Sequence, residues 1–222
     1  MRISTVIIMN CMETGECDEN LQAPYLFRLL YPGAIFRVAN NDKKVYLTFD
    51  DGPTPGVTEQ VLSILEETGV KATFFCTGRR AENSRDLFEQ IGIRGFATAN
   101  HGYDHLKGWG RGKRVYIKNV SEGAEQTGSK LFRPPYGSVT PGQFRSLKNR
   151  FTIVFWDIIL YDFDATFSPG QILRVAQKKL RPGSIIVLHD SSKSSCLRFL
   201  PDLIKLVRKE GYTFGDLSVD LK

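Results

Sequence analysis

Short strand-like runs alternate with amphipathic helix-like runs along most of this chain, and this alternation restricts its fold more than any other feature. The strand-like runs lie at 45–49, 71–76, 95–99, 131–133, 151–156, 184–189 and 212–214. Between them lie the helix-like runs, at 54–69, 83–90, 115–126, 140–147, 168–180 and 200–207. Strands separated by helices pair in parallel. We therefore expect an α/β fold, either a (β/α) barrel of about seven parallel strands or an open doubly wound sheet.

Several helix boundaries carry their own signals. Thr54 and Pro55 are expected to start the first helix, and Gly69 to end it. Thr140 and Ser168, each followed by proline, are expected to start two later helices.

Polar side chains gather where the predicted strands end. In parallel α/β folds the loops after the carboxyl ends of the strands build the site. The residues at these ends are Asp50, Asp51, His101, His105, Arg133, Tyr136, Asp157, Asp162, Asp164, His189 and Asp190. The chain has 3 histidines, and all of them lie there. Histidines with scattered structural roles would not be expected to converge in this way.

The stretch HGYDH predicts a metal site. The spacing of His101 and His105 would place both imidazoles on one face of a helical turn, although such a pair also arises by coincidence on a surface. A cation held by one aspartate and two histidines keeps positions open for water and substrate, which is typical of catalytic zinc. Cobalt and nickel also suit such ligands.

Asp50 and Asp51 would repel each other without a cation nearby. One could bind the metal while the other acts as general base, and the spacing alone does not assign the roles. A turn with an aspartate cap is the alternative interpretation of this pair.

RPPYG and LHD are open to two interpretations each. RPPYG is a rigid stretch because of its two prolines. It could hold a backbone N–H that stabilises an oxyanion, with Arg133 paired to a catalytic carboxylate. The alternative is that it is only a loop that follows a strand. His189 could be a core histidine or a proton donor to a leaving group.

Five stretches together resemble the polysaccharide deacetylase family, also called the NodB-homology or chitooligosaccharide deacetylase-like family (carbohydrate esterase family 4). They are TFDDGP at 48–53, HGYDH at 101–105, RPPYG at 133–137, the acidic stretch at 157–164 and LHD at 188–190. The resemblance runs from about residue 24 to 217. It implies a distorted (β/α) barrel and a metal-dependent hydrolase that removes the N-acetyl group of an amino sugar in a glycan, an oligosaccharide or a lipid-linked sugar.

The resemblance also implies residue roles. Asp50 resembles the catalytic base, and Arg133 the arginine that orients it. Asp51, His101 and His105 resemble the metal ligands, with Zn²⁺ expected and Co²⁺ or Ni²⁺ as alternatives. His189 resembles the general acid and Asp162 its supporting acid. The remaining expected contacts to the substrate or oxyanion are Tyr136, Leu188 and Phe163.

Three positions depart from the family pattern. Gly102 stands where the family has a hydroxyl residue, which would remove a hydrogen bond that stabilises the loop. Ile159 stands in place of an acid and Phe163 in place of tryptophan. These two changes bear on substrate class.

Two other functions fit the residues. A glycan-binding module that keeps the metal loop could use exposed aromatic rings, but it would need neither Asp50 nor His189. An amidase that acts on a small non-sugar amide could use the same metal ligands.

The remaining expectations concern organisation and location. We expect an N-terminal extension at 1–23 and a catalytic domain at 24–222. The 4 cysteines form no C-x-x-C pair and do not indicate a disulfide framework. No convincing signal peptide is present, so we expect a cytoplasmic protein. No nucleic-acid-binding motif is present, and nothing indicates an oligomeric state.

The formal net charge of +6 fits either a solvated basic surface or anionic surroundings such as a membrane face or an acidic glycan. The apolar segment 24–36 could make weak contact with a membrane surface. The alternative is that it packs against the barrel.

Overall fold

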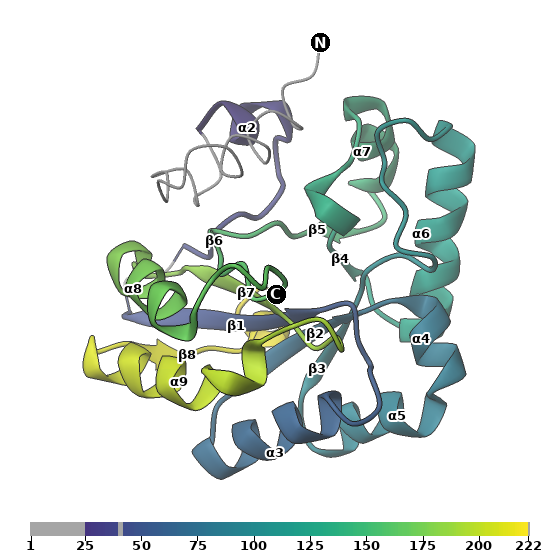
Figure 1. The fold of residues 1–222 in the computed structure, drawn as a ribbon. Coiled ribbons are helices and arrows are strands. Elements are labelled where there is room, and N and C mark those ends of the chain that lie inside the picture. Colours follow the sequence, from purple (N-terminus) through teal and green to yellow (C-terminus); the bar gives the residue numbers. More distant parts are fainter. Residues whose placement is uncertain (1–24, 40–41, 222) are drawn as a thin grey trace.

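A single curled sheet forms the frame of the molecule (Figure 1). The structure is a computed structural model, and it describes residues 25–39 and 42–221. Within this part, seven strands follow the order β5-β4-β3-β2-β1-β7-β6, and β8 pairs with the start of β1. Every pair is parallel. This curled half-barrel confirms the expected distorted (β/α) barrel.

The strands are short, and most match the predicted runs. They are β1 (Lys44–Asp50), β2 (Ala72–Cys76), β3 (Ala97–Asn100), β4 (Leu131–Phe132), β5 (Thr152–Ile153), β6 (Ile158–Ile159), β7 (Ile185–His189) and β8 (Thr213–Phe214). The expected strand at 151–156 was wrong beyond Ile153, and β6 was not predicted.

Helices flank both faces of the sheet. They are α2 (Tyr25–Leu30), α3 (Thr58–Thr68), α4 (Gly78–Asn83), α5 (Arg85–Ile93), α6 (Lys113–Thr127), α7 (Pro141–Leu147), α8 (Pro169–Lys179), α9 (Leu200–Lys209) and α10 (Leu217–Asp220), with the 3₁₀ turns η2 (Pro135–Gly137) and η3 (Cys196–Arg198). Figure 1 shows α3 and α5 along one part of the sheet, and α8 and α9 along another. In the described part, no helix is long and apolar enough to cross a bilayer.

The helix caps confirm some boundaries and correct others. Thr140 and Ser168 each accept a hydrogen bond from the N–H three residues later, as expected. Gly69 ends α3 with φ of +63°. The start of α3 is different: Thr54 does not cap it, because Gly56 has φ of +80° and the helix begins only at Thr58. The predicted helix at 83–90 corresponds to α5, and a further helix that was not predicted, α4, precedes it.

Side chains along each strand point alternately to the helix-covered face and to the concave face of the sheet. Along β1, Val45, Leu47 and Phe49 face the helices and join the largest apolar core. Tyr46 faces the concave side, where a smaller core includes Phe75. Asp50 lies an even number of residues after Tyr46, so its side chain also points to the concave face of the sheet.

Residues 34–38 run from the segment that follows β5 to the segment that precedes β7. Ile35 forms a parallel bridge with Val154, just beyond β5, while Arg37 forms an antiparallel bridge with Ser184, just before β7. Phe36 is buried against Phe155, with stacked rings 4.7 Å apart. This part of the segment 24–36 therefore packs against the barrel. Leu29 and Leu30 in α2 are exposed, and the expected membrane contact stays a prediction.

Two of the cysteines, Cys76 and Cys196, are buried free thiols. Cys11, Cys17 and the expected N-terminal extension lie outside the described residues.

Candidate active site and metal centre

The predicted site residues meet at the carboxyl edge of the sheet because the strand register aligns them. Asp50 pairs with His189 of β7. Asn100 pairs with Cys76 and with Phe132, so His101 and Arg133 each begin a loop at this edge. Residues far apart in sequence thus lie side by side at the carboxyl edge of the sheet.

Asp51, His101 and His105 form the candidate metal centre. One ligand atom from each lies within 4.8 Å of the others. Asp51 Oδ1 lies 3.0 Å from His105 Nε2 and 3.6 Å from His101 Nε2. His101 Nδ1 lies 2.9 Å from the Arg133 carbonyl oxygen, which can only accept, so Nδ1 carries the proton. The lone pair of Nε2 therefore faces Asp51, as a metal ligand requires.

The charges at this centre suit a cation. Burial lowers the pKa of His101 to about 4, which keeps the ring neutral. Burial opposes ionisation of Asp51, yet His105 and His101 hold the pKa of its carboxyl below the usual range. Asp51 Oδ1 is buried, and no donor in the described part reaches it with hydrogen-bond geometry. A carboxylate oxygen in this state, beside two imidazole nitrogens, fits a divalent ion such as zinc.

Asp50 is held by a buried arginine. Arg133 donates from Nη1 to Asp50 Oδ1 at 2.6 Å and to the Thr48 hydroxyl at 2.8 Å. Its guanidinium carbon lies 4.0 Å from the centre of the Phe75 ring. The second oxygen of Asp50, Oδ2, lies 3.9 Å from His101 Nε2. One carboxylate oxygen is therefore fixed by Arg133, and the other faces the metal centre.

His189 is held by Asp162. The backbone N–H of His189 donates to Asp162 Oδ2 at 2.7 Å, and its Nδ1 lies 2.8 Å from Oδ1. Ser194 donates a further hydrogen bond to Oδ2 at 2.5 Å. Burial opposes the charged imidazole, but Asp162 outweighs it and raises the pKa of His189 to about 9. His189 is thus a protonated imidazole at neutral pH, with Nε2 free of this pair.

Tyr136, Phe163 and Leu188 occupy different positions. The half-exposed ring of Tyr136 lies 4.5 Å from the His105 ring, and Tyr136 has φ of +58°. The Phe163 ring stands edge-on to His189 at 5.1 Å. The Leu188 side chain is fully buried in the core on the helix side of the sheet, so its side chain does not reach the site.

Two acids that follow the fifth predicted strand lie elsewhere. Asp157 precedes β6 at the opposite edge of the sheet, where it accepts from Arg181 Nε at 2.9 Å and from Ser184 Oγ at 2.8 Å. Its placement among candidate site residues was wrong, because the chain turns before it begins a new strand. Asp164 is used locally, accepting from Thr166 N at 2.9 Å.

The loop that carries the two histidines is not helical, which corrects the expected helical turn. His105 has φ of +55° and Gly102 has φ of +74°. The loop is held by Asn100, which accepts from Gly102 N at 2.8 Å, and by Asn119, which accepts from Tyr103 N at 3.1 Å. These two amides support the loop in which Gly102 replaces the family's hydroxyl residue.

Neither amide was among the residues predicted from the sequence. A signal for Asn119 was available, since this polar residue interrupts the buried stripe of α6 between Tyr116 and Val120.

Asp190 anchors the loop after β1. Its oxygens accept from Gly52 N at 2.9 Å and from the Thr58 hydroxyl at 2.6 Å. A Cβ on Gly52 would lie 2.0 Å from Asp190 Oδ2, so only glycine fits there. Burial raises the pKa of Asp190 to about 7.

The fold and the clustered carboxylates, imidazoles and guanidinium define an α/β-barrel hydrolase. The family model described as polysaccharide deacetylase matches residues 37–150. The chain belongs to the polysaccharide deacetylase family.

Relatives in sequence carry related names. A peptidoglycan-N-acetylglucosamine deacetylase of Bacillus cereus is 31% identical over 199 residues, covering 82% of this chain and 90% of that protein. A chitooligosaccharide deacetylase of Azorhizobium caulinodans is 34% identical over 167 residues, covering 71% of this chain and 79% of that protein.

Solved structures share the fold. The Bc1960 peptidoglycan N-acetylglucosamine deacetylase, solved with an N-hydroxy benzamide compound, has a TM-score of 0.77 and 28% identity, covering 87% of this chain and 94% of that one. A mutant of BA3943, a CE4 family pseudoenzyme with restored activity, also has a TM-score of 0.77, at 25% identity, with 86% and 72% of the chains covered. The fold therefore occurs in active and in inactive proteins.

Proposed function

We propose that this chain hydrolyses the N-acetyl group of an N-acetylated amino sugar, in a glycan, an oligosaccharide or a lipid-linked sugar, and releases acetate and the free amine. The observation that carries this proposal is the pairing of Asp50 with Arg133 and of His189 with Asp162 beside the Asp51–His101–His105 cluster. The names of the sequence relatives support the same chemistry.

Asp51, His101 and His105 would hold a divalent cation, and Zn²⁺ suits this set best. When bound, the cation would polarise the acetyl carbonyl and lower the pKa of the attacking water to about 7.

Asp50 takes the proton of the attacking water through Oδ2, while Arg133 holds Oδ1 in place. The backbone N–H of Tyr136 stabilises the negative oxygen of the tetrahedral centre. His189 then donates its proton to the sugar nitrogen as the carbon–nitrogen bond breaks, and Asp162 keeps its ring oriented. Phe163 and the backbone of Leu188 border the acyl group.

The acid–base pairs also favour an enzyme over a binding module. A protein that only binds sugar needs neither a buried Asp–Arg pair nor a histidine whose pKa is raised to about 9. These two pairs would have no role in such a module.

Acetate release from N-acetylglucosamine oligomers, peptidoglycan fragments and lipid-linked N-acetyl sugars tests the proposal, with and without a chelator. We expect release from at least one substrate, lost with the chelator and restored by Zn²⁺. No release from any of them, by protein shown to hold metal, would count against a deacetylase. Release from a non-sugar amide alone would identify an amidase.

A further inference from the structure

A small cavity of about 210 Å³ lies against the candidate metal centre. Asp51 and His105 form one of its walls, and the residues that follow β2 and β3 form the rest. Neither Asp50 nor His189 lines it. Sites that enclose a drug-sized ligand measure about 300–1,000 Å³, so this cavity has room for a substituent rather than a whole sugar.

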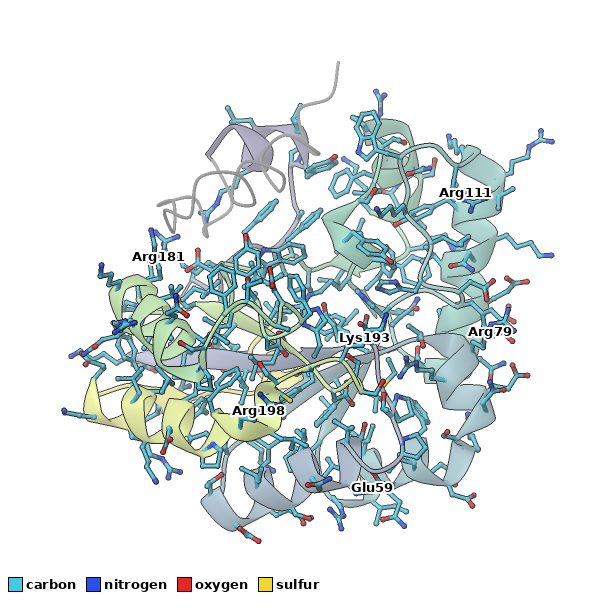
Figure 2. All side chains as sticks on the ribbon, viewed as in Figure 1. Glu59, Arg79, Arg111, Arg181, Lys193 and Arg198 are labelled. Carbon is cyan, nitrogen blue, oxygen red and sulfur yellow. The ribbon has the colours of Figure 1, made fainter. Side chains whose placement is uncertain are left out.

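Two arginines of α4, Arg79 and Arg80, line the cavity. Arg79, labelled in Figure 2, is already paired with a carboxylate, since its Nε donates to Asp104 Oδ1 at 2.7 Å. Its guanidinium also lies 5.1 Å from the centre of the Tyr103 ring. The charge of Arg79 is therefore balanced within the protein.

Arg80 is different. It is half-buried, and it donates from Nη1 to the hydroxyl of Thr54. Within residues 25–39 and 42–221 it forms no ion pair. A guanidinium has five N–H donors in a planar fork that suits carboxylate and phosphate. Arg80 thus offers charge and unused donors at the cavity wall.

The position of this charge is informative because the cavity shares Asp51 and His105 with the metal centre. A cation bound there would repel the guanidinium of Arg80. An anionic group seated between the two positive charges would turn this repulsion into attraction on both sides. The arrangement therefore favours an anion in the cavity.

We propose that the cavity binds an anionic group of the substrate, a carboxylate or a phosphate on the acetylated sugar or its neighbour, and that Arg80 recognises it. This inference rests on the proposed deacetylase function and narrows its substrate to acidic acetylated sugars. The +6 net charge of the chain would also favour such substrates at long range.

The test compares acetate release from three matched oligosaccharides, which are neutral, carboxylate-bearing or phosphate-bearing. Each is tested with the full chain, with Arg80→Gln and with the control Arg174→Gln, an exposed arginine of α8 without an ion pair in the described part. We expect the ratio of kcat/KM between an anionic and the neutral substrate to fall about tenfold in Arg80→Gln. The ratio should not change in Arg174→Gln.

Binding to Zn²⁺-loaded Asp50→Asn protein separates this inference from the deacetylase proposal, because this variant keeps the cation near Arg80 and should not turn over the substrate. By calorimetry, N-acetylmuramic acid or N-acetylglucosamine 1-phosphate should bind more tightly than N-acetylglucosamine, and Arg80→Gln should remove the difference. A gain for only one of the two identifies carboxylate or phosphate as the group recognised. If no substrate releases acetate, the deacetylase proposal fails and this binding result alone decides the inference. An unchanged preference in Arg80→Gln, or no preference in the unaltered chain, overturns it.

Discussion

Asp50 and Asp51 are neighbours in the chain, yet their carboxylates serve different partners. Asp50 completes β1, and its side chain extends to Arg133 on the concave face. Asp51 has φ of +81°, which directs its carboxylate to His105 instead. The expectation that the two acids have different roles fits this geometry.

Replacing Asp50 by asparagine should abolish turnover without releasing the metal. Asparagine keeps an oxygen for Arg133 but cannot accept the proton of water at neutral pH. We expect kcat to fall at least about 100-fold, in line with the loss of a general base. Acetate assays and metal analysis of the purified variant would measure both quantities. A variant with the rate of the unaltered enzyme would rule out Asp50 as the base.

Deprotonation of His189 should lower kcat at alkaline pH. Asp162 raises the pKa of His189 to about 9, so the imidazole is protonated below that pH and loses its proton as the pH rises through it. A proton donor acts only in the protonated form. We therefore expect kcat to stay level near neutral pH and to fall above about pH 9.

The Asp162→Asn variant tests the cause of this limit. Without the negative charge the pKa of His189 should drop, and the alkaline fall in kcat should move to lower pH by at least about one unit. A pH profile of kcat at saturating substrate would show the shift. An alkaline limb at the same pH in both proteins would exclude His189 as its source.

The loop after β3 owes its shape to a neighbouring helix rather than to its own sequence. Asn119 in α6 accepts from the backbone of Tyr103, while Asn119 Nδ2 donates to Asp104 Oδ2 at 3.3 Å. The loop in turn places His105 opposite Asp51. α6 thus orders the metal centre although it supplies no ligand.

The Asn119→Ala variant should therefore bind zinc about tenfold more weakly, the usual cost of losing an outer support. Competition with a chromogenic chelator would measure the dissociation constant. Lys118→Ala, on the same helix with an exposed side chain, is the matched control. Equal affinities in Asn119→Ala and in the control would show that the loop holds its shape without this amide.

Local signals predicted some elements well and others poorly for a physical reason. The caps at Thr140 and Ser168 depend on contacts within a few residues, so the sequence reveals them. The His101–His105 spacing was taken for a helical turn because the partner that prevents it, Asn119, is distant in sequence. The start of α3 was misplaced because Gly56 adopts φ of +80°, which the Thr-Pro signal before it does not reveal.

At the scale of the molecule, buried ion pairs hold together the edge of the sheet that lies opposite the candidate site. Asp157 is fully buried and pairs with Arg181 and with Arg28, the latter at 3.3 Å. Arg28 belongs to α2, so the pair joins the start of the domain to the loop before β7.

Replacing Asp157 by alanine should lower stability strongly while it leaves the site chemistry in place. Two arginines and the Ser184 hydroxyl would lose their partner, and we expect the free energy of unfolding to drop by about 3 kcal/mol. Urea unfolding would measure this, with the exposed Asp202→Ala as control. A loss no larger than that of the control would show that the buried pair contributes little.

The overall architecture was predictable because strand-like and helix-like runs alternate along the chain. The place of the site was predictable because most predicted strands end at polar residues, and parallel pairing brings such ends together. The closure by residues 34–38 was not predictable, since single bridges such as those of Ile35 and Arg37 leave no periodic pattern. The placement of Asp157 failed likewise, because β6 is too short for alternation to mark it.

The sheet order has a consequence for how the protein is made. β1 lies between β2, which follows it closely in the chain, and β7, which is synthesised much later. A nascent chain leaving the ribosome would hold one edge of β1 unpaired, with Phe49 and its neighbours uncovered, until residues 185–189 emerge. Asp50 and His189 meet only at that moment, so the site cannot form before this late long-range pairing. The interval before it is when chaperones would protect the chain from aggregation.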